Sequence, residues 1–261
     1  MILVADNLQV TNRIIEQALA DMDPNPIQDL VKQLQTAGAE AIDVNSGPLP
    51  RQGEEKMVFL VETIQQVSRL PLCLDTVNPG ALAAGLKVCR MPPVINGFSL
   101  EPAKLERILP LAQEFNCDII GYLLYPGGLV PAGADERLNV AVQLFQAYQE
   151  AGLDPEKLII DPIVPPLMWQ DGPSQAREVL TVIRLLPELL GFPVRTVAGL
   201  SNLTSGLGPS QKRLHLEEAY LAMLTAAGLD MVLLNALHPR TMSIAGACQA
   251  ITGSKIFSLL D

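Results

Sequence analysis

Short apolar runs that end in a carboxylate or an amide recur along the chain. Each run is rich in Ala, Ile, Leu and Val, and the six runs are 41–45, 72–75, 94–96, 158–161, 198–202 and 232–235. Continuous apolar runs of this length are typical of parallel strands that are buried on both faces. A polar residue at the carboxyl end of such a strand would stand at the rim of the sheet, where barrel enzymes build their sites. We therefore expect the six endings to share one binding floor that is rich in Asp and Asn.

Helical patterns separate these runs and predict a chain that alternates between strand and helix. We predict strands near residues 2–5, 40–45, 71–75, 93–96, 118–123, 157–161, 194–200 and 230–235. We predict helices near residues 26–38, 54–68, 79–88, 101–115, 136–151, 174–186, 211–227 and 240–252. Three glycines, Gly38, Gly152 and Gly228, follow helical patterns at the position of a C-cap. Alternation of this kind indicates a parallel sheet covered by helices.

The length and the loops favour one closed barrel. Eight strand–helix units in 261 residues match the roughly 250 residues that a barrel of this kind needs. The stretches rich in Pro and Gly, 46–53, 125–134, 162–173 and 203–210, all follow predicted strands. We interpret them as loops of the catalytic face and not as domain boundaries. We predict an α/β fold, a (β/α)8 TIM barrel, with a single domain over residues 1–261.

Charge and hydropathy narrow the possible partners. The net charge is −10 and the pI is about 4.7, which argues against a nucleic-acid surface, because phosphate binding needs clustered Lys and Arg. No apolar run approaches the roughly 18 residues of a membrane span. Asp6 interrupts the first apolar segment too early for a secretory signal. We expect a cytoplasmic protein that binds neither nucleic acid nor a membrane.

The cysteines and histidines do not predict a metal site. The four cysteines share no C-x-x-C spacing, so we expect free thiols in a reducing compartment. The two histidines, His215 and His238, have no partner at ligand spacing, so we expect no protein-bound metal. His238 follows the last apolar run closely and is a candidate to line the mouth of the barrel.

The strand endings suit a flat heterocycle. A carboxylate can accept two parallel N–H bonds, and the 2-amino-4-oxo edge of a pterin presents two such donors. An Asn side chain adds both a donor and an acceptor, so two Asp and one Asn form a sensible pterin clamp. The alternative is that each of these residues caps the following helix. For Asp161 this alternative is weaker, because Pro162 has no N–H to offer.

Several motifs together resemble one family of enzymes. They occur in order and with similar spacing at Asp43–Pro48, Cys73–Pro79, Val94–Gly97, Ile160–Ile163 and Gly199–Asn202. On these motifs the chain resembles the methyltetrahydrofolate:corrinoid/iron–sulfur protein methyltransferases, which belong to the wider group of pterin-binding barrels. The resemblance covers nearly the whole chain.

The resemblance implies a role for each matching residue. Asp75, Asn96 and Asp161 would bind the pterin ring, and Asn202 would lie beside N5 and its methyl group as the catalytic residue. The other substrate-binding residues that it implies are Gly199 and Ser201 in the wall beside N5, Asp43 in a polar network beneath, and Arg213 as the family's arginine after this loop. For Arg213, an exposed helix residue is an equally good interpretation.

The implied reaction moves a methyl group between N5 of tetrahydrofolate and the cobalt of a corrinoid. A tertiary amine is a poor leaving group, so N5 must gain a proton or a strong hydrogen bond by the transition state. Asn202 can hydrogen-bond N5 but is not a general acid, so the proton would come through water or a nearby carboxylate. The resemblance also implies a homodimer. It further implies that a partner protein carries the corrinoid, because the chain has no Asp-x-His-x-x-Gly motif to bind cobalt.

Two other functions remain open. One is a non-catalytic pterin- or folate-binding barrel, and the other is a barrel enzyme that acts on a different heterocycle. Dihydropteroate synthase is disfavoured, because the last strand ends in Asn235-Ala236-Leu237-His238 and lacks that enzyme's basic signature.

The chain departs from the family at the mouth of the barrel. It has Ala5-Asp6-Asn7-Leu8-Gln9 where relatives begin Gly-Glu-Arg-Ile-Asn, and Tyr122-Leu123-Leu124-Tyr125 where they show a Thr-Met-Asn-like end. The loop after Asn202 is longer and rich in Gly. We predict a retained pterin floor beneath an altered rim, and the direction of transfer stays open.

Overall fold

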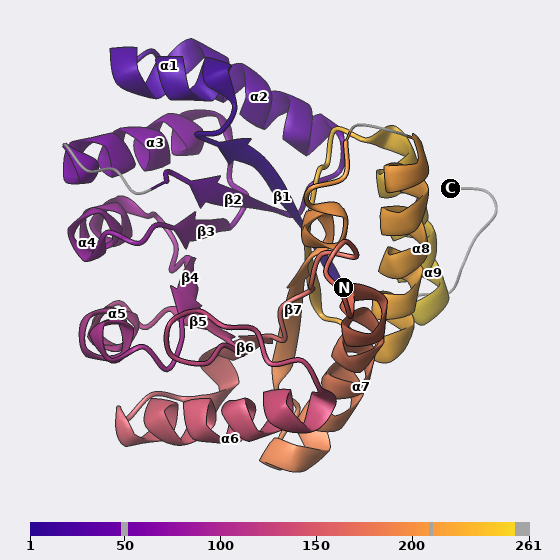
Figure 1. The fold of residues 1–261 in the computed structure, drawn as a ribbon. Coiled ribbons are helices and arrows are strands. Elements are labelled where there is room, and N and C mark those ends of the chain that lie inside the picture. The colour runs from indigo at the N-terminus through magenta and orange to yellow at the C-terminus, as the bar shows by residue number, and fades with distance from the viewer. Residues whose placement is uncertain (48–51, 209–210, 254–261) are drawn as a thin grey trace.

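A closed barrel of parallel strands, ringed by helices, forms the body of the molecule (Figure 1). The computed structural model describes residues 1–47, 52–208 and 211–253. The strands follow one another around the barrel in chain order, and the last strand pairs with the first. They are β1 (Ile2–Gln9), β2 (Ala41–Asn45), β3 (Leu72–Asp75), β4 (Val94–Phe98), β5 (Asp118–Tyr122), β6 (Leu158–Asp161), β7 (Arg195–Gly199) and β8 (Met231–Leu234). The predicted (β/α)8 barrel is confirmed.

Helices cover the outside of the barrel (Figure 1). They are α1 (Arg13–Asp21), α2 (Pro24–Thr36), α3 (Gly53–Val67), α4 (Pro79–Val88), α5 (Pro102–Glu114), α6 (Ala134–Glu150), α7 (Gly172–Leu190), α8 (Gln211–Ala227) and α9 (Pro239–Thr252), with short 3-10 helices η1 (Pro155–Lys157) and η2 (Leu200–Thr204). Gly38, Gly152 and Gly228 have φ values of 93°, 73° and 100°, as expected of glycines that end helices. None of the described helices is long and apolar enough to cross a membrane.

The structure contains one helix that the sequence analysis missed and extends another. At the start of α1, the Asn12 side chain accepts a hydrogen bond from the Ile14 backbone N–H at 3.0 Å. The connection between β1 and α1 is only a few residues long, so the sequence carries little indication that a helix starts here. The prediction that the seventh helix ends near 186 was wrong, because α7 runs through Pro187 to Leu190. A proline usually ends a helix, but Pro187 lies in the last turn of α7, and its carbonyl accepts a hydrogen bond from the Gly191 backbone N–H at 3.1 Å.

Two layers of side chains fill the inside of the barrel. The lower layer is apolar and consists of Val4, Ala41, Cys73, Val94, Ile120, Ile159, Val197 and Met231. Because side chains alternate between the two faces of a strand, the residue two places further along each strand also faces inward. This upper layer is Asp6, Asp43, Asp75, Asn96, Tyr122, Asp161, Gly199 and Leu233. Parallel pairing therefore brings a polar ring to the mouth of the barrel.

Candidate active site

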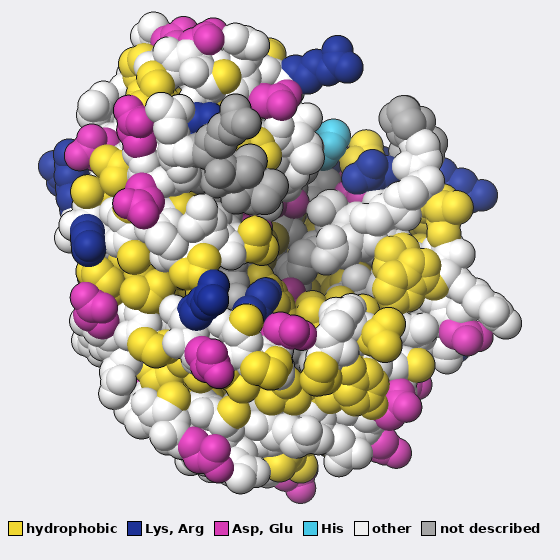
Figure 2. Space-filling view, turned by 60° about the vertical axis from the view of Figure 1, so that its left-hand side comes forward, with side chains coloured by type: hydrophobic (Ala, Val, Ile, Leu, Met, Phe, Trp, Pro, Cys, Tyr) yellow, Lys and Arg dark blue, Asp and Glu magenta, His cyan; other side chains and the backbone are white. Residues whose placement is uncertain are grey.

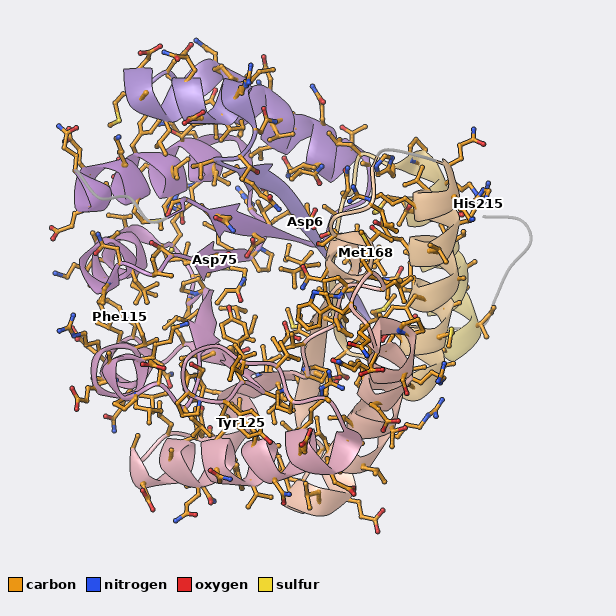
Figure 3. The ribbon with its side chains drawn as sticks, in the orientation of Figure 1. Asp6, Asp75, Phe115, Tyr125, Met168 and His215 are labelled. Atoms are coloured by element: carbon orange, nitrogen blue, oxygen red, sulfur yellow. The ribbon has the colours of Figure 1, made fainter. Side chains whose placement is uncertain are left out.

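The carboxyl ends of the strands enclose a cavity of about 230 Å³ at the mouth of the barrel. Seven predicted site residues line it, namely Asp43, Asp75, Asn96, Asp161, Gly199, Ser201 and Asn202. The rest of its lining is Asp6, Gln9, Asn45, Ile120, Tyr122, Ile163 and Leu233. Figure 3 shows Asp6 and Asp75 within the ring of strands, each coming from a different strand. We call this space the strand-end cavity, and five of the six predicted endings meet in it.

A chain of hydrogen bonds holds the amides and carboxylates on the β2–β5 side of the cavity. The Asn45 side chain donates to Asp75 Oδ2 at 2.6 Å, and the Asn96 side chain donates to Asp43 Oδ1 at 3.0 Å. The hydroxyl of Tyr122 donates to Asn96 Oδ1 at 2.5 Å. Asp43 therefore lies in a polar network with Asn96, as the resemblance implied, and Tyr122 fixes the orientation of the Asn96 amide.

A local turn holds Asp161 at the end of β6. Its Oδ1 accepts a hydrogen bond from the Ile163 backbone N–H at 2.8 Å. Pro162 offers no N–H, as the sequence indicates, and the bond passes over it to the next residue; it closes a local turn and does not cap a helix, since α7 begins only at Gly172. Ile163 has a φ of 63°, a left-handed conformation that is uncommon for a branched residue. The turn fixes one carboxylate oxygen at the cavity wall.

Asp6 and Ser201 connect the first strand to the loop after β7. The Ser201 hydroxyl donates to Asp6 Oδ2 at 3.3 Å, and both residues line the strand-end cavity. Asp6 is one of the residues at which the sequence departs from the resembled family. Its buried carboxyl lies beside Ser201, the residue before Asn202.

Burial makes the cavity carboxyls unusually weak acids. Burial raises the pKa of Asp6 to about 6, and it raises the pKa of Asp161 to about 7, although the Ile163 hydrogen bond opposes the rise. Burial also raises the pKa of Asp75 to about 6, against the opposing effect of the Lys104 charge. The pKa of Asp43 is well above its usual range because the residue is buried and Asp75 lies nearby. Near neutral pH these groups can exchange protons with a ligand, as the groups of active sites often do.

Gly199 makes room for the Asn202 side chain. A Cβ on Gly199 would lie 2.9 Å from Asn202 Nδ2 and 3.4 Å from its Cγ. The amide thus folds back over the end of β7, in a position that only a residue without a side chain permits. The two residues form one unit in the cavity wall.

The comparison with known families agrees with this geometry. The sequence profile of the family described as "Pterin binding enzyme" matches residues 10–235. The chain belongs to this family. The resemblance read from the strand-end motifs is thereby confirmed.

The chain is similar to curated proteins that are named as a methyltransferase and as methionine synthases. The chain is 23% identical to the methylcorrinoid:tetrahydrofolate methyltransferase of Eubacterium limosum, over 97% of this chain and 92% of that protein. It is 24% identical to the methionine synthases of Mycobacterium leprae and Mycobacterium tuberculosis over 86% and 84% of this chain. The match spans only 19% of either methionine synthase.

Solved pterin-binding structures share the fold. Dihydropteroate synthase from Xanthomonas albilineans, in complex with 7,8-dihydropteroate, superposes with a TM-score of 0.62 and 21% identity over 95% of this chain and 93% of that one. The enzyme from Stenotrophomonas maltophilia, with imidazole bound in its active site, gives a TM-score of 0.68 and 19% identity over 98% and 94% of the two chains. At such low identity these likenesses show the barrel alone.

Arg213 lies outside the strand-end cavity. It is on α8, where its Nε lies 3.0 Å from Glu217 Oε1, and it lines a neighbouring cavity with Met168 and Leu216. Its charge still lowers the pKa of Asp6. Arg213 therefore acts on the site through electrostatics, and its predicted contact with substrate remains a prediction.

Asn235 stabilises the structure at the end of β8. Its side-chain oxygen accepts from Asn7 Nδ2 at 2.5 Å and from the Leu237 backbone N–H at 3.0 Å. The Asn7 side chain in turn accepts from the Ala236 backbone N–H at 2.9 Å. These bonds join the ends of the first and last strands, whose pairing closes the barrel. His238, which follows, is the N-cap residue of α9 and does not line the strand-end cavity.

Among the lining residues that sequence reasoning did not assign to the site, Asp6 and Tyr122 take part in its hydrogen bonds, and one signal would have found both. Asp6 and Tyr122 each lie two places beyond a residue of the apolar inner layer, Val4 and Ile120. Strand alternation alone places them in the cavity. The sequence analysis had named both as departures from the family and had not assigned either to the site. Among the described residues, no group of three His, Cys, Asp or Glu side chains could hold a metal ion.

Proposed function

We propose that this protein is a methyltransferase that moves a methyl group between N5 of tetrahydrofolate and the cobalt of a corrinoid. The observation that carries the proposal is the meeting of Asp75, Asn96, Asp161 and Asn202 in one cavity. The similarity to the Eubacterium limosum methyltransferase over 97% of this chain supports it.

The pterin ring would be held by the polar upper layer of the barrel. Asp75 and Asp161 offer carboxylate oxygens to the ring's N–H donors, and Asn96 offers its amide. The network beneath orients these groups before the ring arrives, because Asn45 and Tyr122 already hydrogen-bond to Asp75 and Asn96. Preorganised polar groups lose little entropy on binding. The fit between the cavity and a flat ring with several N–H groups supports a pterin ligand.

Asn202 would stand at the reacting nitrogen, with Asp6 as the nearby acid. Removing a methyl group from N5 requires a proton or a strong hydrogen bond at that atom, and an amide supplies only the second. Asp6 has a pKa of about 6 and accepts a hydrogen bond from Ser201, which adjoins Asn202. A protonated Asp6 could deliver its proton through water near neutral pH when N5 loses its methyl group, and in the opposite direction the Asp6 carboxylate would take the proton that N5 releases on methylation. In this proposal Ser201 positions Asp6, and Gly199 positions Asn202.

The corrinoid would come from a partner protein and supply the cobalt that accepts or gives the methyl group. The rim above the cavity fits such a partner, because the loops after β5 and β6 expose the apolar side chains of Tyr125, Leu129, Met168 and Trp169. Figure 3 shows Tyr125 and Met168 on the loops outside the strands. An apolar, solvent-exposed rim is typical of a surface that another molecule covers. The sequence departures at the mouth of the barrel therefore suit a different corrinoid protein as partner better than a different ring in the substrate.

Direction and assembly are also proposals. The name of the Eubacterium limosum relative favours transfer from methylcorrinoid to tetrahydrofolate. We further propose that residues 1–261 form one pterin-binding domain, that two copies form a homodimer, and that the protein works in the cytoplasm.

The Asn202→Ala variant tests whether the protein is an enzyme or only binds folate. Calorimetry with 5-methyltetrahydrofolate measures binding, and a methyl-transfer assay measures turnover. The proposal predicts that the variant binds folate almost normally and transfers methyl about 100-fold more slowly, the typical loss when one aligned hydrogen-bond donor is removed. Equal rates in the wild type and the variant would show that Asn202 has no role at N5. A wild-type protein that binds folate but transfers nothing would be a binding protein.

A further inference from the structure

A second cavity lies beside the strand-end cavity and carries the positive charge that the first one lacks. It has a volume of about 270 Å³ and shares Asp75, Asn96 and Tyr122 with the strand-end cavity. Neither Lys, Arg nor His is among the residues lining the strand-end cavity, whereas Lys104 and Arg107 line the second. The two cavities therefore adjoin at Asp75, Asn96 and Tyr122, with an acidic space on one side and a basic one on the other. We call this second space the α5 cavity.

The two basic residues stand one helical turn apart on α5. Lys104 is half-buried, and its Nζ lies 5.3 Å from the centre of the Tyr122 ring, a distance at which a cation and an aromatic face attract each other. Arg107 follows three residues later and lies on the same face of α5, because residues three apart are neighbours on a helix. Its side chain is exposed. Neither forms a salt bridge within the described part of the chain. Figure 2 shows Lys and Arg side chains at the edge of the hollow in this face.

Apart from Thr76 and Gly97, the remaining wall of the α5 cavity is apolar. Val77, Pro79, Ala103 and Ile108 line it, and the Val77 side chain is 68% exposed. An exposed apolar wall next to two cations suits a ligand with a flat hydrophobic part and carboxylates at one end. The p-aminobenzoyl-glutamate tail of folate has this form, since an aromatic ring precedes one or more glutamyl carboxylates.

We propose that the α5 cavity binds the tail of folate, with the aromatic ring against Val77 and Pro79 and the glutamyl carboxylates at Lys104 and Arg107. This inference rests on the proposed function, because it assumes that the pterin ring lies in the strand-end cavity. This position of the tail also keeps N5 accessible to the corrinoid. A tail that runs over α5 points away from β7 and does not cover the reacting atom beside Asn202. Tetrahydrofolates with several glutamyl residues should bind more tightly than those with one.

Calorimetry with three probes and three single variants tests this site. The probes are 6-methyltetrahydropterin, which has no tail, 5-methyltetrahydrofolate with one glutamate, and its triglutamate. The variants are Lys104→Gln, Arg107→Gln and the matched control Lys87→Gln, which removes an exposed charge outside both cavities. We expect each α5 variant to weaken binding of the triglutamate about fivefold, the size of one partly exposed ion pair, and Arg107→Gln to leave the pterin unaffected. The control should match the wild type with all three probes.

Each alternative outcome is distinct. If both α5 variants bind the triglutamate as tightly as the wild type, the tail site is wrong while the proposed function stands. If those variants slow transfer with the corrinoid partner but keep full folate affinity, the cations contact the partner instead, and the proposal is also overturned. If even the pterin does not bind the wild type, both the proposed function and the tail site fail. Arg107 is exposed, so its variant should fold, and circular dichroism verifies that it does.

Discussion

Replacing Gly199 with Ala should slow methyl transfer while leaving the barrel folded. The new Cβ would lie 2.9 Å from Asn202 Nδ2, a separation that real Cβ atoms essentially never show. The atom it meets is the end of a flexible side chain, so the amide can rotate away while the backbone stays in place. The Asn202 side chain would then leave the position that the structure gives it.

The expected effects on stability and rate differ greatly in size. Gly199 has a φ of −83°, which Ala adopts easily, and a change from Gly to Ala at such a site stabilises a protein by about 0.4–1 kcal/mol. Forcing a side chain off its rotamer costs about 0.5–1.5 kcal/mol. The free energy of unfolding should therefore change by less than about 1 kcal/mol. Misplacing a donor at the reacting atom slows an enzyme by about 100-fold or more.

A cobalamin assay and a folate-binding measurement separate these effects. The methyl-transfer rate is followed by absorbance, folate affinity by calorimetry, and stability by thermal unfolding. Gly246→Ala on α9 is the matched control, because an added Cβ there meets no atom within 4 Å. The double variant Gly199→Ala/Asn202→Ala should be no slower than Asn202→Ala, since both changes act through one amide. A Gly199→Ala protein with the wild-type rate would refute the reasoning.

Three further predictions rest on single contacts. Tyr122→Phe removes the hydrogen bond that Asn96 accepts at 2.5 Å and should lower the free energy of unfolding by about 1–3 kcal/mol, as measured in urea, and weaken folate binding. Stability should fall as pH rises from about 4 to about 7, because Asp161, with its pKa raised to about 7, keeps a proton when folded that the unfolded chain releases. Asp161→Asn should flatten that slope, and an unchanged slope in pH-dependent unfolding would contradict the raised pKa. Asn7→Ala removes two hydrogen bonds to the end of β8 and should cost about 1–3 kcal/mol of stability, with folate affinity unchanged in calorimetry.

The barrel could be predicted because its signals are local and repeated. Each strand is a short apolar run, and glycines such as Gly38 and Gly228 end helices in a conformation that other residues avoid. The missed helix α1 has a weaker signal, since its Asn12 cap lies only three residues after β1. The predicted end of α7 near residue 186 stops short of Leu190, because the helix continues through Pro187.

Most of the residues that line the site could be predicted from the sequence, but the hydrogen bonds between them could not. Asp75, Asn96 and Asp161 could be read from the chain because strand ends carry the polar residues of a barrel. The link from Ser201 to Asp6 joins residues that are 195 positions apart, and no local pattern encodes such a pairing. The position of Arg213 depends on how α8 packs against η2, so sequence could not decide whether it reaches the cavity.

The most direct test of the central claim is methyl transfer to and from free cobalamin, which stands in for the corrinoid of the partner. The protein is mixed with methylcobalamin and tetrahydrofolate in one experiment and with Co(I) cobalamin and 5-methyltetrahydrofolate in the other, and the absorbance of the cobalamin is followed. The account predicts conversion in at least one direction, which Asn202→Ala slows about 100-fold. No conversion in either direction, by a wild-type protein that binds folate normally, would contradict it.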